Sequence, residues 1–389
     1  MHTSAAGTPF VRTAALAVAV ASVLGAAGCG QGATPAGSGG STNTVKVTLT
    51  DDACKPDKAS VAAGSYVFSI TNQNSAKASE VELRDGERIL GEKENLTPGL
   101  AGQFTLELAA GEYNLYCPGA KTDTTKFSVT GTGKSAAAGD ATTAQLLKTA
   151  TTQYASYIKT EVGALVTSTK PFVAAVQAGN VAQAKQLYAP ARVHYERVEP
   201  VAESFADLDP DIDARENDVP PAKWSGFHKI EQALYAKNTT AGMAPVAAKL
   251  LADVQKLNTL VQTETYQPAQ LANGAADLLG EVSKSKITGE EERYSHIDLV
   301  DFRANVDGAE QAYAPLVPAL KRTDPTLAAT VTSRFAAVDA LLAKYTDPAA
   351  PGGYKLYTQL TQADTRALAQ AVDSLAEAES KVAGKVVGK

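Results

Sequence analysis

His228 and Glu231 lie three positions apart in the segment WSGFHKIEQALY (224–235). On a helix this spacing places both side chains on one face. A histidine and a carboxylate at this spacing are a common pair of metal ligands inside helical bundles. The alternative is an ordinary helix in which His228 makes a local hydrogen bond and Glu231 faces solvent. Spacing alone leaves both interpretations open.

A second set of candidate ligands precedes this pair. Glu196, Glu199 and Glu203 follow each other at i, i+3 and i+7, so a helix would place three carboxylates on one stripe. Like charges at this spacing repel each other, and a bound cation would relieve the repulsion. The alternative is a solvated acidic face that is paired with Arg192 and Arg197.

The segment DLDPDID (207–213) has the alternating aspartates of a calcium loop. The EF-hand pattern fails, because Ile212 stands where glycine is required and Asp218 stands where the bidentate glutamate belongs. We therefore exclude an EF-hand, although one of these aspartates could reach a neighbouring site.

Ser295 and Asp298 have the spacing of a capping box, which predicts a helix that begins at His296. That helix would direct the Asp298 carboxylate toward the protein interior. Carboxylates and one imidazole from separate helices suit a hard cation better than a soft one, although copper(II) or zinc would also bind such a site in vitro.

These residues need elements to position them, and two kinds are expected. Residues 45–130 alternate apolar and polar side chains between turn signals, which is typical of short strands and predicts an antiparallel β-sandwich. Cys54 and Cys117 are the two cysteines beyond position 29, and a disulfide between them is the default in an oxidising compartment.

The sandwich region contains neither histidine nor methionine, which excludes a type-1 copper site. Its acidic residues Glu80, Glu82, Glu92 and Glu94 are either exposed strand charges or a second metal site.

Residues 131–143 (GTGKSAAAGDATT) form a low-complexity linker, after which the hydrophobic period changes. Segments rich in alanine, leucine, glutamine and glutamate, separated by glycine or proline, predict an all-α helical bundle over residues 144–389. A chain of 389 residues is long enough for these two separate cores.

The first residues predict export. Arg12, an apolar run at 14–24 and small residues before Cys29 indicate a lipoprotein signal peptide at 1–28, with Cys29 as the lipidated residue. The alternative is a plain secretory peptide that is cleaved near Ala27. Residues 29–44 would then be the lipidated cysteine and a flexible tether. The net charge of −6, without a basic cluster, argues against nucleic acid as a partner.

Three helical segments, HYERVEPVAESFADLDPDIDARE (194–216), WSGFHKIEQALY (224–235) and ITGEEERYSHIDLVDFRANVDGA (287–309), resemble the imelysin-like domain of the EfeO family. Members of this family are extracytoplasmic components of bacterial ferrous- and elemental-iron uptake systems. DDACKP (51–56) and GEYNLYCPG (111–119) resemble the family's cupredoxin-like domain. The resemblance implies a β-plus-α chain of two domains, with an N-terminal Greek-key, cupredoxin-like β-sandwich and a C-terminal imelysin-like bundle.

The resemblance also implies functional residues and partners. It makes His228 and Glu231 the metal-binding pair and adds surrounding acids, namely Glu196, Glu199, Asp213 and Asp298. It implies a second site at Glu80, Glu82, Glu92 and Cys117, for which copper or zinc is left open, although a Cys54–Cys117 disulfide would remove the thiolate. The implied cargo is Fe²⁺ or Fe³⁺, and the implied partners are a membrane iron permease and an exported haem (dye-decolourising) peroxidase.

The leading hypothesis is therefore an iron-binding lipoprotein on the extracytoplasmic face of the cell membrane, attached by its lipid anchor only and not an enzyme. One alternative is a zinc-dependent metallopeptidase that uses the His-x-x-Glu motif, although the chain has no His-Glu-x-x-His motif. The other is a scaffold lipoprotein without a metal.

Overall fold

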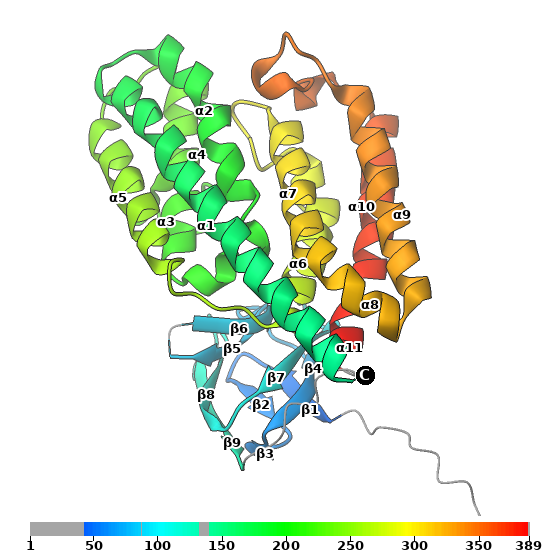
Figure 1. Cartoon of the computed structure of the whole chain (residues 1–389). Coiled ribbons are helices and arrows are strands. Elements are labelled where there is room, and N and C mark those ends of the chain that lie inside the picture. Colours follow the sequence, from blue (N-terminus) through cyan, green and yellow to red (C-terminus); the bar gives the residue numbers. More distant parts are fainter. Residues whose placement is uncertain (1–42, 87, 132–139, 388–389) are drawn as a thin grey trace, which may run out of the picture. The chain divides into compact units, whose positions relative to one another are not determined.

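The computed structural model describes residues 43–86, 88–131 and 140–387, without the side chain of Glu203 (Figure 1). The predicted signal peptide, Cys29, and most of the tether and of the linker lie outside the described residues. Two hydrophobic cores are present, one among the strands and one among the helices. The structure thus confirms the predicted β-plus-α fold class.

The strands form two sheets, with the orders β2-β1-β4-β7 and β3-β9-β8-β5-β6. Pairs β1–β4 and β3–β9 are parallel and the other pairs are antiparallel. The sequence predicts an antiparallel sandwich, and the two parallel pairs differ from it, since a period of two fixes which side chains face the core but not the direction of the neighbouring strand. The bounds are β1 Thr44–Leu49, β2 Cys54–Pro56, β3 Ser60–Ala62, β4 Gly64–Asn72, β5 Val81–Asp85, β6 Arg88–Lys93, β7 Ala101–Leu108, β8 Gly111–Tyr116 and β9 Thr124–Thr130.

A disulfide joins Cys54 to Cys117 inside the sandwich core, and both residues are fully buried. Cys54 begins β2 in one sheet, and Cys117 directly follows β8 in the other. The bond therefore ties the two sheets together and closes a loop of 63 residues, which reduces the entropy of the unfolded chain.

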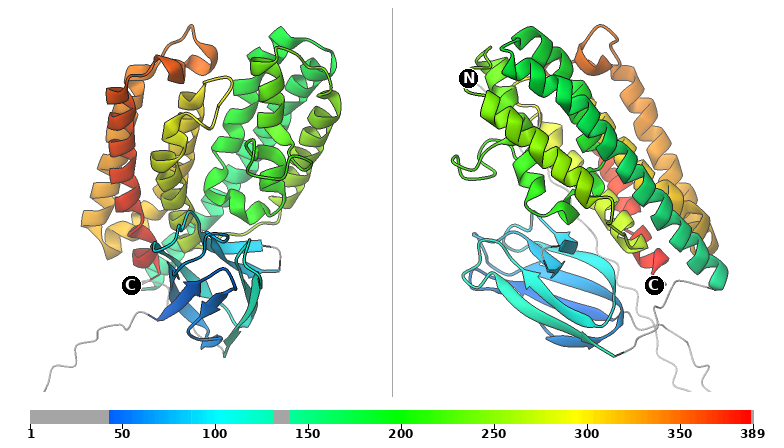
Figure 2. Two further views of the ribbon diagram at one scale, coloured as in Figure 1. Left: turned by 180° about the vertical axis from the view of Figure 1, so that it is seen from behind. Right: turned by 60° about the vertical axis from the view of Figure 1, so that its left-hand side comes forward.

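The helical part places α1 beside α2 and α5, and α6 beside α7 and α10 (Figures 1 and 2). The α-helices are α1 Ala141–Gln177, α2 Val181–Glu196, α3 Leu208–Asp213, α4 Gly226–Glu231, α5 Ala244–Leu260, α6 Pro268–Lys284, α7 Asp298–Tyr313, α8 Val317–Thr323, α9 Pro325–Leu342, α10 Gln362–Glu379 and α11 Val382–Val386. Short 3₁₀ segments include Glu199–Phe205 and Lys286–Thr288, and a π turn at Gln232–Ala236 extends α4.

Two helix ends differ from the sequence expectation. The helix α1 begins within the predicted linker, because the Asp140 side chain accepts a hydrogen bond from the Thr143 amide at 3.0 Å and so caps the helix. The acidic stripe Glu196, Glu199 and Glu203 was expected on one helix, but α2 ends at Glu196 and a 3₁₀ segment follows from Glu199. Pro200 provides a physical reason, since proline lacks the amide hydrogen and disfavours helical backbone in the residue before it.

Glu379, at the end of α10, is a buried carboxyl group whose two oxygens have no hydrogen-bond partner among the described residues. Burial raises its pKa well above the ordinary value. The folded protein therefore keeps the proton at pH values where the unfolded chain has already lost it, so folding stability falls as pH rises from about 4 toward neutrality.

We expect Glu379→Leu to raise the free energy of unfolding at pH 7 by about 1–3 kcal/mol, because it removes an unpaired buried polar group. The gain should shrink as pH falls toward 4. Urea denaturation at several pH values measures both effects. Glu377→Leu, which changes an exposed residue of the same helix, is the matched control and should give no gain. A Glu379→Leu protein that is less stable than wild type at pH 7 would contradict this account.

Candidate metal centre

Three side chains from separate segments converge at the imidazole of His228. Asp213 ends α3, His228 lies in α4, and Glu291 lies in the segment before α7. One ligand atom from each lies within 4.8 Å of the others. His228 Nε2 is 3.3 Å from Glu291 Oε1 and 3.7 Å from Asp213 Oδ1, and it has no hydrogen-bond partner among the described residues. A buried nitrogen that faces two carboxylates has the donor set of a cation site.

Gly226 allows α4 to approach α3 closely. Its φ is +81°, and a Cβ atom at this position would lie 2.1 Å from the carbonyl oxygen of Ile212. Next to it, the hydroxyl of Ser225 donates a hydrogen bond to the carbonyl oxygen of Asp211 at 2.8 Å. These contacts hold the start of α4 against the end of α3, and they bring His228 beside Asp213.

Glu231 is placed behind the imidazole instead of beside the other two acids. Its Oε2 lies 3.2 Å from His228 Nδ1, and its Oε1 accepts hydrogen bonds from the amides of Tyr294 and Ser295 at 2.8 and 2.7 Å. The sequence interpretation made Glu231 a metal ligand. In the structure its oxygens meet Nδ1 and these two amides, so Glu231 contacts the ring at the nitrogen that does not face Asp213 and Glu291, where carboxylates behind ligating histidines commonly lie.

Arg192 lies fully buried at the centre of the acidic cluster. Its guanidinium contacts the carboxylates of Asp213, Glu196 (2.7 Å), Glu291 (2.6 Å), Glu292 (2.8 Å) and Asp301 (3.0 Å). Burial alone would lower the pKa of Arg192, but the acids outweigh it and raise the pKa well above its ordinary value. A permanent positive charge therefore binds segments from α2 to α7 together.

Glu196 and Glu199, two of the predicted ligands, meet a second internal cation. Lys286 Nζ lies 2.6 Å from Glu199 Oε1 and 3.4 Å from Glu196 Oε2, and Asn305 Nδ2 donates to both acids. The acidic stripe is thus not solvated, contrary to one sequence interpretation. Its repulsion is relieved by Arg192 and Lys286, and in this arrangement neither glutamate faces Nε2 of His228. The side chain of Glu203 lies outside the described part of the chain.

Asp298 does not cap a helix with Ser295. The helix α7 begins at Asp298 itself, and His296 has a left-handed φ of +60° that a helical residue does not adopt. Asp298 Oδ1 accepts a hydrogen bond from the Glu292 amide at 3.0 Å, while the Ser295 hydroxyl bonds to the Glu292 carboxylate. The capping box was therefore wrong, since both side chains have partners in the folded segment before α7. Asp298 is buried, as expected, and supports that segment.

The three converging side chains differ in the direction and cause of their pKa shifts. Burial and Arg192 lower the pKa of His228, but Glu231, Glu291 and Asp213 outweigh them and raise it to about 9. Burial raises the pKa of Asp213 to about 6 against the opposing charge of Arg192. Burial would also raise the pKa of Glu291, but Lys286, His228 and Arg192 hold it well below the ordinary value. Glu291 is thus an ionised carboxylate, and a protonated His228 already presents one positive charge to it.

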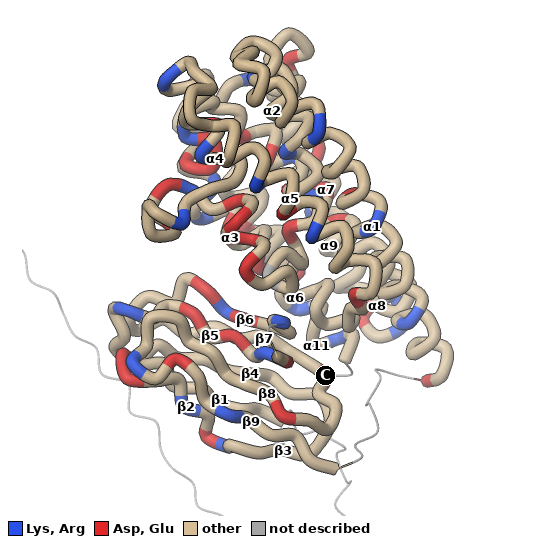
Figure 3. Tube along the Cα trace, turned by 90° about the vertical axis from the view of Figure 1, so that its left-hand side faces the viewer, with Lys and Arg blue, Asp and Glu red and all other residues tan. Residues whose placement is uncertain are grey.

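The acids of the sandwich form a second, smaller cluster. Glu80, Glu92 and Glu94 offer ligand atoms within 4.8 Å of one another, and Figure 3 shows acidic positions along β5 and β6 as well as on α3. Glu82 is instead paired with the guanidinium of Arg84. Cys117 is in the disulfide and offers no thiolate, so this part of the predicted second site is corrected.

The sequence does not point to Glu291 or Lys286 as members of the site, and it indicates Arg192 only as a partner of the acidic stripe, a pairing that the structure confirms for Glu196. Glu291 belongs to the run Glu290-Glu291-Glu292, which gives no sign of which acid faces inward. Arg192 lies four residues before Glu196, a spacing that indicates an ion pair but not its burial. Lys286 carries no local signal for burial, because its two nearest partners, Glu199 and Glu196, lie far away in the chain.

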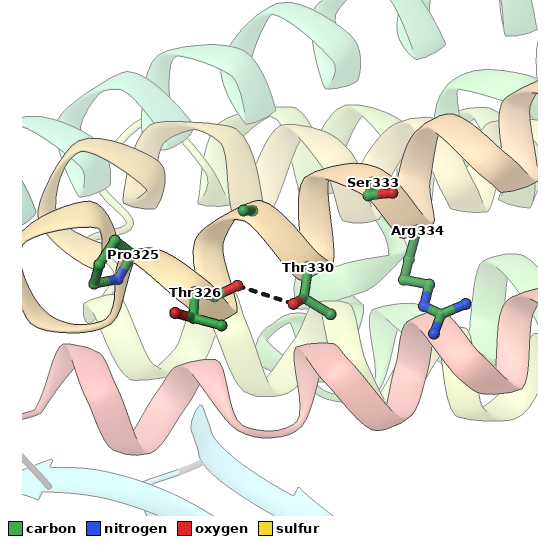
Figure 4. A pocket seen from close by; sticks show the side chains of 6 residues that line it. Pro325, Thr326, Thr330, Ser333 and Arg334 are labelled. Carbon is green, nitrogen blue, oxygen red and sulfur yellow. Dashed lines mark hydrogen bonds between the residues drawn. The ribbon is translucent and has the colours of Figure 1, made fainter.

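The surface of α9 carries a different kind of hollow, with a volume of about 720 Å³ (Figure 4). It is lined by small and hydroxyl side chains and one charged residue, namely Pro325, Thr326, Ala329, Thr330, Ser333 and Arg334. Among the described residues, the segment Pro325–Tyr345 is the one helix long and apolar enough to cross a membrane, by length and composition only. This surface offers no set of metal ligands.

Comparisons with known proteins agree with this architecture. Residues 150–382 match the imelysin family, and residues 15–127 match the cupredoxin-like domain. Over 345 residues the chain is 42% identical to the iron uptake system component EfeO of Escherichia coli K12. The aligned region covers 87% of this chain and 90% of the Escherichia coli protein. Proteins of the same description from Shigella flexneri and Shigella sonnei match equally well.

A solved structure is also similar in fold. The crystal structure of an iron-regulated protein A precursor from Parabacteroides distasonis superposes with a TM-score of 0.50 and 17% identity. The match covers 61% of this chain and 95% of that one. At this identity the likeness concerns the fold alone.

Proposed function

Because the chain belongs to the EfeO family of iron uptake system components, with imelysin and cupredoxin-like domains, we propose that it captures iron outside the cell membrane and delivers it to a membrane iron permease. The observation that supports capture is the buried His228 Nε2, which lies 3.3 Å from Glu291 Oε1 and 3.7 Å from Asp213 Oδ1, so that one imidazole and two carboxylates converge. We assign these three side chains as the iron ligands and Glu231 as the group that orients the imidazole.

The chemistry of the three ligands favours iron. Two carboxylates and one imidazole are donors that suit ferrous or ferric iron better than a soft ion such as copper(I). Three protein ligands also leave coordination positions open, which makes release of the ion easier than from a closed four-ligand site. A protein that hands its cargo to a permease needs such reversible binding.

The proposal includes the location and partners of the protein. The signal peptide at 1–28 and lipidation of Cys29 would attach the mature chain to the outer side of the cell membrane through residues 29–44. The exported haem peroxidase would be a second partner. Glu80, Glu92 and Glu94 would form a second site for iron, copper or zinc.

The lipid anchor can be tested by palmitate labelling. Labelling of the wild type but not of Cys29→Ser would support the anchor, and equal labelling of both would refute it.

A zinc metallopeptidase is the second candidate, since the imelysin family model carries a peptidase name. The exposed fractions of the three side chains argue against it: 2% for His228, 3% for Glu291 and 11% for Asp213. A peptide bond must reach the metal of a peptidase, and these groups are almost closed to solvent.

Metal titration of the purified mature chain distinguishes the candidates. After treatment with a chelator, the protein is titrated with Fe²⁺ without oxygen, with Fe³⁺ and with Zn²⁺, and its hydrolysis of a peptide mixture is measured in parallel. We expect saturable iron binding and no hydrolysis. Zinc-dependent hydrolysis would instead establish a peptidase, and the lack of saturable binding would leave a scaffold.

A further inference from the structure

Glu291 is shared between the proposed metal position and a set of internal cations. Its Oε1 faces His228 Nε2 at 3.3 Å and Arg192 Nη2 at 2.6 Å. Its Oε2 lies 3.0 Å from Arg215 Nη1 and 3.7 Å from Lys286 Nζ. A metal ion that binds Glu291 must therefore share this carboxylate with positive charges that the protein itself supplies.

Lys286 is more easily displaced from Glu291 than Arg192 is. Its contact with Glu291 is the longest of the four, and its ammonium has a nearer partner in Glu199 at 2.6 Å. Arg192 is fixed by five carboxylates, and a planar guanidinium that makes several contacts cannot shift without losing some of them. A lysine is a single point charge on a flexible stem, so it can move toward Glu199 and keep a partner.

The position of Lys286 in the chain links it to the ligand. The 3₁₀ turn Lys286–Thr288 leads through Gly289, whose backbone is left-handed at φ +80°, directly to Glu291. Lys286 itself is 4% exposed and lies among Glu196, Glu199 and Glu291. Its charge is therefore little screened by solvent.

We propose that the Lys286 ammonium is an internal competitor of the metal ion, which keeps the affinity of the His228 site low enough for the ion to be released. The inference rests on the proposed function and adds a residue that regulates it. Two positive charges that share neighbouring carboxylates oppose each other, so each lowers the affinity of the protein for the other. Lys286 thus stabilises the metal-free protein at the expense of metal affinity.

The test is the iron affinity of Lys286→Met, measured by competition with a chelator of known affinity. We expect binding about 5- to 100-fold tighter than in wild type, within the usual range of coupling between two sites. By reciprocity, metal-free Lys286→Met should melt at a lower temperature and gain more from added iron than wild type does. Loss of a purely structural lysine would weaken binding, so the sign of the change is diagnostic.

Three further variants keep the test decisive. Lys284→Met removes an exposed lysine two residues away and should leave the affinity unchanged. Lys286→Arg keeps the charge and should not tighten binding. If Lys286→Met does not fold, a double variant that combines Lys286→Met with Glu199→Gln takes its place. It removes a carboxylate together with the ammonium, and it should still bind iron more tightly than wild type.

The outcomes separate this inference from the proposed function. Wild-type protein that binds iron, with unchanged or weaker binding in the Lys286 variants, overturns the role of Lys286 and leaves iron capture intact. Wild-type protein without saturable iron binding overturns both.

Discussion

Replacing His228 by leucine, Asp213 by asparagine or Glu291 by glutamine is expected to weaken iron binding by at least about 100-fold in each case. Each change removes one of three converging donors from a buried position, where no other free side chain faces Nε2 among the described residues. Glu231→Gln should cost less, about 10- to 100-fold, because the proposed assignment makes Glu231 the group that orients the imidazole through Nδ1 and not a ligand.

Isothermal titration with Fe²⁺ under anaerobic conditions measures these affinities, and circular dichroism shows whether each variant is folded. His194→Gln is the matched control: His194 is also a histidine beside a glutamate, with Nδ1 2.7 Å from Glu161, but it is not among the converging ligands. Its affinity should equal that of wild type. If Glu231→Gln abolished binding as completely as His228→Leu, Glu231 would be a ligand, as the sequence motif suggests, and our assignment would be wrong.

Replacing Arg192 by methionine should produce the largest loss of stability in the molecule. The change leaves Glu196 and Asp213 in the interior without their main counter-charge, and it removes one of the cations beside Glu291. Breaking a buried ion pair by removing one partner typically costs 3–5 kcal/mol, and we expect about this loss in the free energy of unfolding of the metal-free protein. Urea denaturation at neutral pH measures it.

Added iron should restore part of that stability, because the metal ion replaces the missing positive charge. A ligand at 100 times its dissociation constant stabilises the folded state by about 2.7 kcal/mol. Arg197→Met is the control, since Arg197 is partly exposed, and its pairs with Glu161 and Asp307 should contribute no more than about 1 kcal/mol. Equal, small effects of the two substitutions would show that Arg192 does not hold the centre together.

Arg192 and Lys286 also provide a physical reason why a chain with so many buried acids can fold. Burying several carboxylates without cations is costly, and the sequence interpretation looked to a bound metal to offset that cost. In the structure, two internal cations take this role at Glu196, Glu199 and Glu291. Folding of the bundle therefore need not wait for a metal, and the proposed iron would bind a centre that is already assembled.

The sequence by itself determined the two parts of the chain and the identity of the central histidine. Alternation with a period of two between Val45 and Val129 is a local property, and so is the helical spacing of His228 and Glu231. Both survive in the structure as side-chain directions, which follow from backbone geometry alone, but β5 and β6 bury both of their faces, including Glu82 and Glu92.

Only the tertiary structure decided which groups face the imidazole. Asp213 and Glu291 come from segments whose approach to α4 depends on close packing, such as the contact of Gly226 with Ile212. The motif could not show that Glu231 is held by the amides of Tyr294 and Ser295, or that Arg192 and Lys286 enter the acidic cluster. Periodicity says which side of an element is buried, whereas the partner it meets there is set by contacts between residues far apart in the chain.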